Sequence, residues 1–123
     1  MNLMELASKK CIPCSTDATP MAREEAEKLV RALNGWSPAE FNGILKLQKD
    51  FIFKNFKEAI AFTNKVADIA EAEGHHPNIR IHKWNHVEIE NFTHKINGLS
   101  ENDFILAAKI DSITRSESTN TSE

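Results

Sequence analysis

The feature that most constrains the fold is one long amphipathic segment, residues 56–73. Its apolar side chains form a broad helical face, which consists of Phe56, Ala59, Ile60, Phe62, Val66, Ala67, Ile69 and Ala70. Asn55 can cap the start of this helix, and Gly74 can close its end in the left-handed conformation. A face this wide is typical of a helix that packs on a sheet, so we expect residues 56–73 to be the main core helix.

The segment before this helix predicts a β-hairpin. Residues 45–53 alternate apolar and polar side chains, apart from Lys49, which falls among the apolar positions. Asn42-Gly43 is a strong hairpin-turn signal, so it should join this long strand to a short one at residues 39–41.

The segment after the helix predicts a second hairpin, formed by residues 79–84 and 87–94. The alternation places His94 on the face opposite the apolar residues of its strand, which argues against a core histidine there. His82 and His86 flank the turn without a distinctive spacing, and we expect both to be solvated surface residues.

Periodic apolar positions predict two further helices, at residues 22–33 and 100–115. The second opens with the capping-box pattern that runs from Ser100 to Asp103. The resulting order is α-β-β-α-β-β-α. It predicts an α+β fold with a four-stranded antiparallel sheet whose helices pack on one face. Phe92 is expected on the open face, where apolar surface often becomes an oligomer contact.

Both ends of the chain lack this periodicity. We expect residues 1–20 to form a flexible arm, residues 116–123 to be a disordered tail, and residues 21–115 to form the folded domain. Cys11 and Cys14 form a lone Cys-x-x-Cys pair in the arm. Such a pair can hold half of a zinc site or form a redox disulfide, but two reduced cysteines in a mobile segment fit the pattern better.

Composition narrows the class of protein. The 123 residues suit one domain, and 41% hydrophobic with 27% charged residues is ordinary for a globular protein. A net charge of -3 gives no reason to expect nucleic-acid binding through a basic patch. No apolar run approaches the ~20 residues that span a bilayer, so we expect no membrane association and a cytoplasmic location.

Two adjacent histidines stand where the chain should be stiff. Gly74 caps the preceding helix, and Pro77 forces the backbone at His76 toward an extended conformation. An imidazole exchanges protons near neutrality because its ordinary pKa is ~6.5, so His75 and His76 are candidates for acid/base chemistry. The alternative is an ordinary surface turn.

The histidine pair belongs to a longer pattern with set spacings. Its members are Glu71, His75-His76-Pro77, Trp84, His94 and Asp103. This pattern resembles the signature of the pterin-4a-carbinolamine dehydratases. The resemblance covers about residues 21 to 113 and includes Gly35-Trp36, Thr93-His94 and the segment from Gly98 to Asp103. Trp84 stands where many members have Tyr, and Asn91 replaces an apolar strand residue.

The resemblance implies a hydro-lyase, a 4a-hydroxytetrahydrobiopterin dehydratase. Such an enzyme converts 4a-hydroxytetrahydropterin to quinonoid dihydropterin and water, a step in recycling the tetrahydropterin cofactor of aromatic amino acid hydroxylases. It implies a pterin substrate, a possible functional link to such a hydroxylase, and no cofactor or metal. It also implies a homo-oligomer, a dimer or a tetramer.

The resemblance also implies roles for individual residues. The histidines that would line the pterin site are His75, His76 and His94. The residues expected beside the substrate are Glu71, Trp36, Thr93 and Asp103. Loss of water requires one proton to reach the departing hydroxyl and one to leave N5, so we expect His75 and His94 to be the acid/base pair and His76 to hold the ring.

Other readings of the same residues stay open at this stage. Trp36 is alternatively a core side chain. Glu71 and Asp103 alternatively only orient imidazoles or cap a helix, and capping is the favoured alternative for Asp103. Three histidines with nearby carboxylates could bind Zn²⁺, although adjacent histidines seldom reach one ion together. The protein could also be a non-enzymatic, coactivator-like interaction module.

Overall fold

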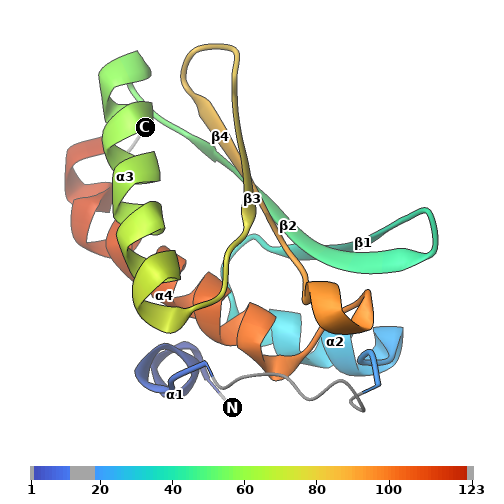
Figure 1. Cartoon of the computed structure of the whole chain (residues 1–123). Helices are drawn as coiled ribbons and strands as arrows, with labels where there is room; N and C mark the ends of the chain where they lie inside the picture. Colours follow the sequence, from blue (N-terminus) through green and yellow to red (C-terminus); the bar gives the residue numbers. More distant parts are fainter. Residues whose placement is uncertain (1, 12–18, 122–123) are drawn as a thin grey trace.

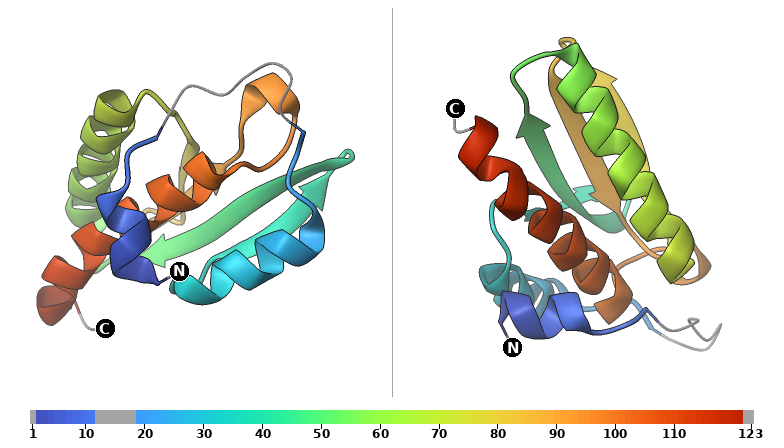
Figure 2. Two further views of the ribbon diagram at one scale, coloured as in Figure 1. Left: turned by 90° about the horizontal axis from the view of Figure 1, so that it is seen from below. Right: turned by 90° about the vertical axis from the view of Figure 1, so that its left-hand side faces the viewer.

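A four-stranded antiparallel sheet forms one layer of the structure (Figure 1). The computed structural model describes residues 2–11 and 19–121, with side chains as far as Thr114. The strands lie in the order β1-β2-β4-β3. Their bounds are Ser37–Phe41 for β1, Ile44–Ile52 for β2, Asn78–His82 for β3 and His86–Asn91 for β4. Figure 2 shows the helices gathered on one face of this sheet, which confirms the predicted α+β architecture.

Both hairpins have the turns that their sequences favour. Asn42 and Gly43 have φ angles of 52° and 80°, as a type I′ turn requires, and they join β1 to β2. The β3–β4 turn contains Lys83 and Trp84, which also have positive φ angles, 49° and 52°. Trp84 is 66% exposed at the tip of this hairpin.

Lys49 breaks the apolar alternation of β2 because it faces a buried carboxylate. Its Nζ lies 3.0 Å from Oδ1 of Asp111, whose side chain is 1% exposed. The same oxygen accepts a hydrogen bond of 2.9 Å from Nε1 of Trp36. These partners offset the cost of burying the carboxylate, because an unpaired charge in the core would be strongly destabilising.

Helix α3, Phe56–Glu73, has the bounds that the sequence predicts. The Asn55 side chain caps its first turn with a hydrogen bond of 2.8 Å, and Gly74 closes it at φ 66°. Its buried residues are Ala59, Phe62, Val66 and Ala70. Phe56 and Ile60 are 51% and 37% exposed, so the buried face is narrower than expected. The reason is that α3 shares the covered face of the sheet with α4 (Figure 2).

The first predicted helix, residues 22–33, is present in two parts. Helix α2 occupies Arg23–Leu29, and a 3₁₀ turn follows at Val30–Ala32. Gly35, at φ 85°, then turns the chain toward β1.

The N-terminal segment differs from the flexible arm that we expected. Residues Leu3–Ser8 form helix α1, which packs against α4 and buries Leu6 completely. Asn2 and Glu5 form a capping box at its start. A helix of six residues is too short for a periodic signal, which is why the sequence pattern missed it. Residues 12–18, including Cys14, lie outside the described part of the chain.

Helix α4, Glu101–Thr121, is enclosed along its first half. Residues 102–108 are all buried, whereas the sequence predicts only one apolar stripe. The additional burial arises because the sheet, α3 and α1 all contact this helix. The assigned helix ends at Thr121, later than the predicted end at residue 115, in a stretch with no glycine or proline to stop it. The disordered tail that we expected at residues 116–123 stays a prediction.

Truncation of Leu6 tests whether α1 is part of the fold. We expect Leu6→Ala to lower the free energy of unfolding by about 2 to 5 kcal/mol, because it leaves a cavity between α1 and α4. Met4→Ala on the same helix is the matched control, since Met4 is 75% exposed and should change stability little. Urea unfolding followed by circular dichroism measures both. Equal stability of the two variants would mean that α1 does not contribute to the core.

Candidate active site

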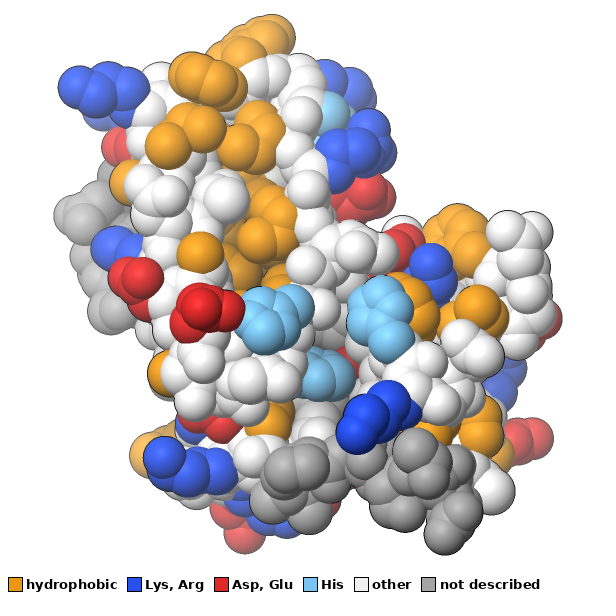
Figure 3. All heavy atoms as spheres, viewed as in Figure 1, with side chains coloured by type: hydrophobic (Ala, Val, Ile, Leu, Met, Phe, Trp, Pro, Cys, Tyr) orange, Lys and Arg blue, Asp and Glu red, His pale blue; other side chains and the backbone are white. Residues whose placement is uncertain are grey.

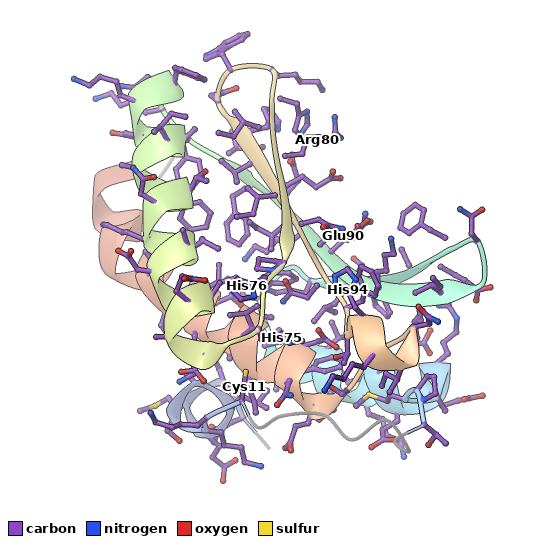
Figure 4. All side chains as sticks on the ribbon, in the orientation of Figure 1. Cys11, His75, His76, Arg80, Glu90 and His94 are labelled. Atoms are coloured by element: carbon purple, nitrogen blue, oxygen red, sulfur yellow. The ribbon has the colours of Figure 1, made fainter. Side chains whose placement is uncertain are left out.

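The histidine pair follows directly on the C-terminal cap of α3 (Figure 4). Gly74 takes the left-handed conformation, and the amide of His75 donates to the carbonyl of Ala70 at 3.2 Å. Pro77 leads into β3. A helix cap and a strand therefore hold the backbone of His75 and His76 from both sides.

His75 is held by a buried carboxylate. Its Nε2 lies 2.6 Å from Oδ1 of Asp103; the His75 side chain is 13% exposed, and the Asp103 side chain is fully buried. The other oxygen of Asp103 accepts hydrogen bonds from the Thr93 hydroxyl at 2.8 Å and the Ser100 amide at 2.9 Å. A carboxylate on Nε2 favours the tautomer with its proton there, which leaves Nδ1 of His75 as a proton acceptor.

Asp103 also caps helix α4, so it both contacts a histidine of the site and caps a helix. A capping box has two hydrogen bonds, and one of them is present here: the Ser100 amide donates to the Asp103 carboxylate. The Ser100 hydroxyl pairs with the Thr93 hydroxyl at 2.9 Å instead of with the amide of Asp103, which bonds the Ser100 carbonyl. The start of α4 and the orientation of His75 thus depend on one side chain.

His76 has its own acidic partner on α3. Its Nε2 lies 2.6 Å from Oε1 of Glu71, one helical turn before the cap. The two side chains are 61% and 78% exposed, so solvent screens this pair and it contributes little to stability. Its effect is to orient the imidazole of His76.

His94 approaches the same place from the end of β4. It begins a 3₁₀ turn, His94–Ile96, and its side chain is exposed. Its ring centroid lies 4.2 Å from that of Phe92, and the Lys46 ammonium lies 4.5 Å from the Phe92 centroid. Phe92 is only 8% exposed, so it is not the open apolar surface that we expected, because these two side chains cover it.

The three histidines gather around one hollow on the surface (Figure 3). Figure 4 shows His75 and His76 on one side of it and His94 on the other. Asp103 connects the two sides, because it binds both His75 and Thr93, the residue before His94. The structure therefore brings together three imidazoles from two separate segments, as the resemblance implies.

Other residues of the signature lie elsewhere or face inward. Trp36 is 5% exposed, donates its indole N–H to Asp111 and packs edge-on against Phe51, so it has little surface to offer a substrate. Thr93 is 5% exposed with its hydroxyl bound to Asp103, and it positions the site from within. Trp84 lies in the β3–β4 turn, at the opposite end of these strands from His75, His76 and His94.

A polar core residue lies behind the site, at the position where the sequence departs from the apolar residue of the family pattern. Asn91 is fully buried on β4, and its Nδ2 donates to the carbonyl of Asp103 at 3.1 Å. Within the described part of the chain, its Oδ1 has no hydrogen-bond partner. The signal was present in the sequence, since a polar residue interrupts the apolar positions of β4.

Cys11 is held in place beside the end of α3. Its amide donates to Glu73 at 2.8 Å, and its thiol contacts the carbonyl of Asn102 at 3.6 Å. The bond from the Cys11 amide holds the pKa of Glu73 below its usual range. Burial, followed by the charge of Glu73, raises the pKa of the Cys11 thiol to about 12. Cys11 is thus a packed, neutral thiol rather than a cysteine in a mobile arm.

Metal-ligating side chains group elsewhere among the described residues. Asp50, His82 and His86 bring their ligand atoms within 4.8 Å of one another, whereas His75, His76 and His94 form no such group. His82 and His86 are also not the solvated residues that we expected. Their side chains are 22% and 18% exposed, because both rings bind Asp50.

Fold and site together define an α+β protein with three histidines gathered at the end of its sheet. The family model described as "Pterin 4 alpha carbinolamine dehydratase" matches residues 19–113. The chain therefore belongs to the pterin 4α-carbinolamine dehydratase family.

Individual relatives agree with this assignment. The chain is 46% identical over 113 residues to pterin-4-alpha-carbinolamine dehydratase 2, mitochondrial, of Arabidopsis thaliana. The matched region is 91% of this chain and 60% of the longer Arabidopsis protein. It is 45% identical to a Rubrobacter xylanophilus protein that carries the same dehydratase name, over 89% of the chain and 98% of the relative.

Two solved structures share the fold. A transcriptional coactivator/pterin dehydratase from Brucella melitensis matches with a TM-score of 0.69 and 32% identity, over 77% of this chain and 98% of that one. A pterin dehydratase-like protein described as a RuBisCO assembly factor in the alpha-carboxysome matches with a TM-score of 0.54 and 25% identity, over 65% of this chain and 89% of that one.

The environment of Cys11 predicts an unreactive thiol. A pKa of about 12 instead of 9.0 lowers the thiolate fraction at pH 8 by about a thousandfold, so iodoacetamide should alkylate Cys11 far more slowly in folded protein than in urea. Cys14→Ser protein followed by mass spectrometry isolates this thiol. Because the folded-state pKa is raised, the associated stability is present below pH 9 and is lost as the pH rises toward 12. Equal alkylation rates with and without urea would contradict this environment.

Proposed function

We propose that this protein catalyses the dehydration of 4a-hydroxytetrahydropterin to quinonoid dihydropterin and water. The observation that carries the proposal is the geometry of the three histidines. Two segments place His75, His76 and His94 around one hollow, with His75 held by the buried Asp103. The family of the chain supports the reaction class, a hydro-lyase.

The reaction needs two proton transfers, and the site offers two imidazoles for them. The bond between C4a and the hydroxyl oxygen breaks, and a proton must reach that oxygen so that it leaves as water. The proton on N5 departs as the bond between C4a and N5 becomes double. We assign these transfers to His75 and His94, which come from opposite sides of the hollow. Asp103 stabilises His75 in its cationic form during the exchange.

The remaining side chains of the site have positioning roles in this proposal. His76, oriented by Glu71, holds the pterin ring at the solvent-exposed edge. Thr93 fixes Asp103 from inside, beside the turn that carries His94. We leave Trp36 out of the substrate site, because its indole N–H is bound to Asp111 in the core.

The biological setting is a further part of the proposal. Regeneration of tetrahydropterin after its use by an aromatic amino acid hydroxylase is the process that this dehydration would serve. Among the described residues, no helix combines the length and apolar character that crossing a bilayer demands. The cytoplasmic location that we expected stays a prediction, and the Arabidopsis relative is named as mitochondrial.

A protein-interaction role is the second candidate function. The Brucella structure is described both as a transcriptional coactivator and as a pterin dehydratase. Such a role does not require the histidine cluster, whereas this chain keeps His75, His76 and His94 together with Asp103. A turnover assay therefore discriminates between the two candidates.

We also propose that the protein is a homo-oligomer. The open face of the sheet is polar, but several large apolar side chains are exposed at the start of α3 and beside the β3–β4 turn (Figure 3). They are Ile52, Phe56, Ile60 and Trp84, with exposed fractions between 37% and 66%. Apolar surface of this kind usually marks a contact with another chain.

Replacement of single histidines tests the catalytic assignment. We expect His75→Ala and His94→Ala each to reduce turnover by roughly 10² or more, because each removes a proton-transfer group. His82→Ala is the matched control, since it removes an imidazole on the open face of the sheet. Stopped-flow measurement of carbinolamine decay gives the rates. Full activity in His75→Ala protein would refute the assignment, and inactive wild-type protein would favour the interaction role.

A charge at the exposed apolar surface tests the oligomer. Phe56→Glu/Ile60→Glu should shift the molar mass from a dimer or tetramer toward the 13.9 kDa monomer in size-exclusion chromatography with light scattering. Met4→Glu is the control, because Met4 is exposed on α1. A wild-type protein that is monomeric at every concentration would rule out the proposal.

A further inference from the structure

A second cluster of titratable side chains lies outside the active site. Asp50 on β2, His82 on β3 and His86 on β4 meet on the open face of the sheet. His86 begins β4 and His94 follows its end, so the cluster and the active site lie at opposite ends of this strand, roughly 17 Å or more apart at 3.3–3.4 Å per residue. No step of the proposed reaction uses the cluster.

The three side chains converge on one point. Nε2 of His82 lies 2.7 Å from one oxygen of Asp50, and Nδ1 of His86 lies 2.6 Å from the other. The centroids of the His82 and His86 rings are 4.9 Å apart, and the angle between the ring planes is 46°. Each residue offers one ligand atom, and these atoms all lie within 4.8 Å of one another.

The fold holds this arrangement before any ligand arrives. His82 and His86 are the last cross-strand pair of the β3–β4 hairpin, next to a turn in which Lys83 and Trp84 have positive φ angles. Asp50 reaches them from β2, which pairs with β4 on its other side. Because the three backbones belong to one hydrogen-bonded sheet, little conformational entropy is lost when the side chains bind a common partner.

The charge of the cluster suits a cation. Both oxygens of the Asp50 carboxylate face imidazole nitrogens, at 2.7 Å from His82 and 2.6 Å from His86, so oxygen and nitrogen ligand atoms meet at one point. Glu88, the cross-strand neighbour of Asp50, is paired with Arg80 at 3.0 Å. The carboxylate available to an added cation here is therefore that of Asp50.

We propose that Asp50, His82 and His86 bind a divalent transition metal ion, with Zn²⁺ as the best fit. Two imidazole nitrogens and one carboxylate oxygen are a common zinc ligand set, and water completes the tetrahedron. Zinc with bonds of about 2.0–2.1 Å separates its ligand atoms by roughly 3.3 Å, so the side chains need only a small rotation from their present contacts. The ion replaces the protons that the imidazoles now share with Asp50, and it ties β2 to the β3–β4 hairpin.

Zinc binding to untagged full-length protein tests this proposal. A Cys14→Ser background removes the Cys-x-x-Cys pair as a competing site. After treatment with a chelator and dialysis, we expect one Zn²⁺ per chain by equilibrium dialysis with metal analysis, and a higher melting temperature with zinc than without. Co²⁺ in the same site should give the visible absorption of a tetrahedral complex.

Matched variants locate the metal. His82→Gln/His86→Gln should weaken zinc binding about 100-fold or more. His75→Gln/His76→Gln removes the same number of imidazoles at the active site and should bind zinc like the parent protein. Asp50→Asn keeps a side chain that can form hydrogen bonds but removes the carboxylate, so it should also weaken zinc binding. This variant tests the site if the double variant fails to fold. Absence of zinc binding in the parent protein at millimolar metal, or equal losses in the two double variants, would overturn the proposal.

Discussion

A buried carboxylate on α4 is the constraint on which the active site depends. Asp103 has no exposed surface, and an uncompensated charge at such a position would be strongly destabilising. Its compensation comes from His75 after α3, Thr93 after β4 and the Ser100 amide at the start of α4. Three connections must therefore meet at one point, and His75 reaches it from 28 residues earlier in the sequence. The side chain that caps the start of α4 also orients the imidazole of His75, to which we assign a proton transfer in the proposed reaction.

The two faces of the sheet have different chemistry for a physical reason. On the covered face, α3 and α4 bury apolar side chains, and Trp36 adds a hydrogen bond to the buried pair of Lys49 with Asp111. On the open face, polar side chains pair across the strands, and carboxylates such as Asp50 can hold two partners at once. The open face can therefore carry a ligand site without disturbing the core, while the proposed reaction site lies at the end of the sheet.

Local signals in the sequence predicted what local forces decide. The bounds of α3 follow from Asn55 and Gly74, and the first hairpin follows from the Asn42-Gly43 turn, because caps and turns act over three or four residues. The signature also identified His75 and its acidic partner Asp103 as members of one site. It did not indicate which acid would hold which histidine, since that pairing depends on how the segments pack.

By itself, the sequence determined the kind of fold, the family and the residues able to exchange protons, because periodicity, turn residues and side-chain chemistry are properties of the chain. Only the tertiary structure decided the rest. It made a core residue of Trp36, covered Phe92, docked α1 on α4 and joined His82 and His86 to Asp50. These outcomes depend on contacts between residues distant in sequence, whose geometry exists only once the sheet and helices pack together.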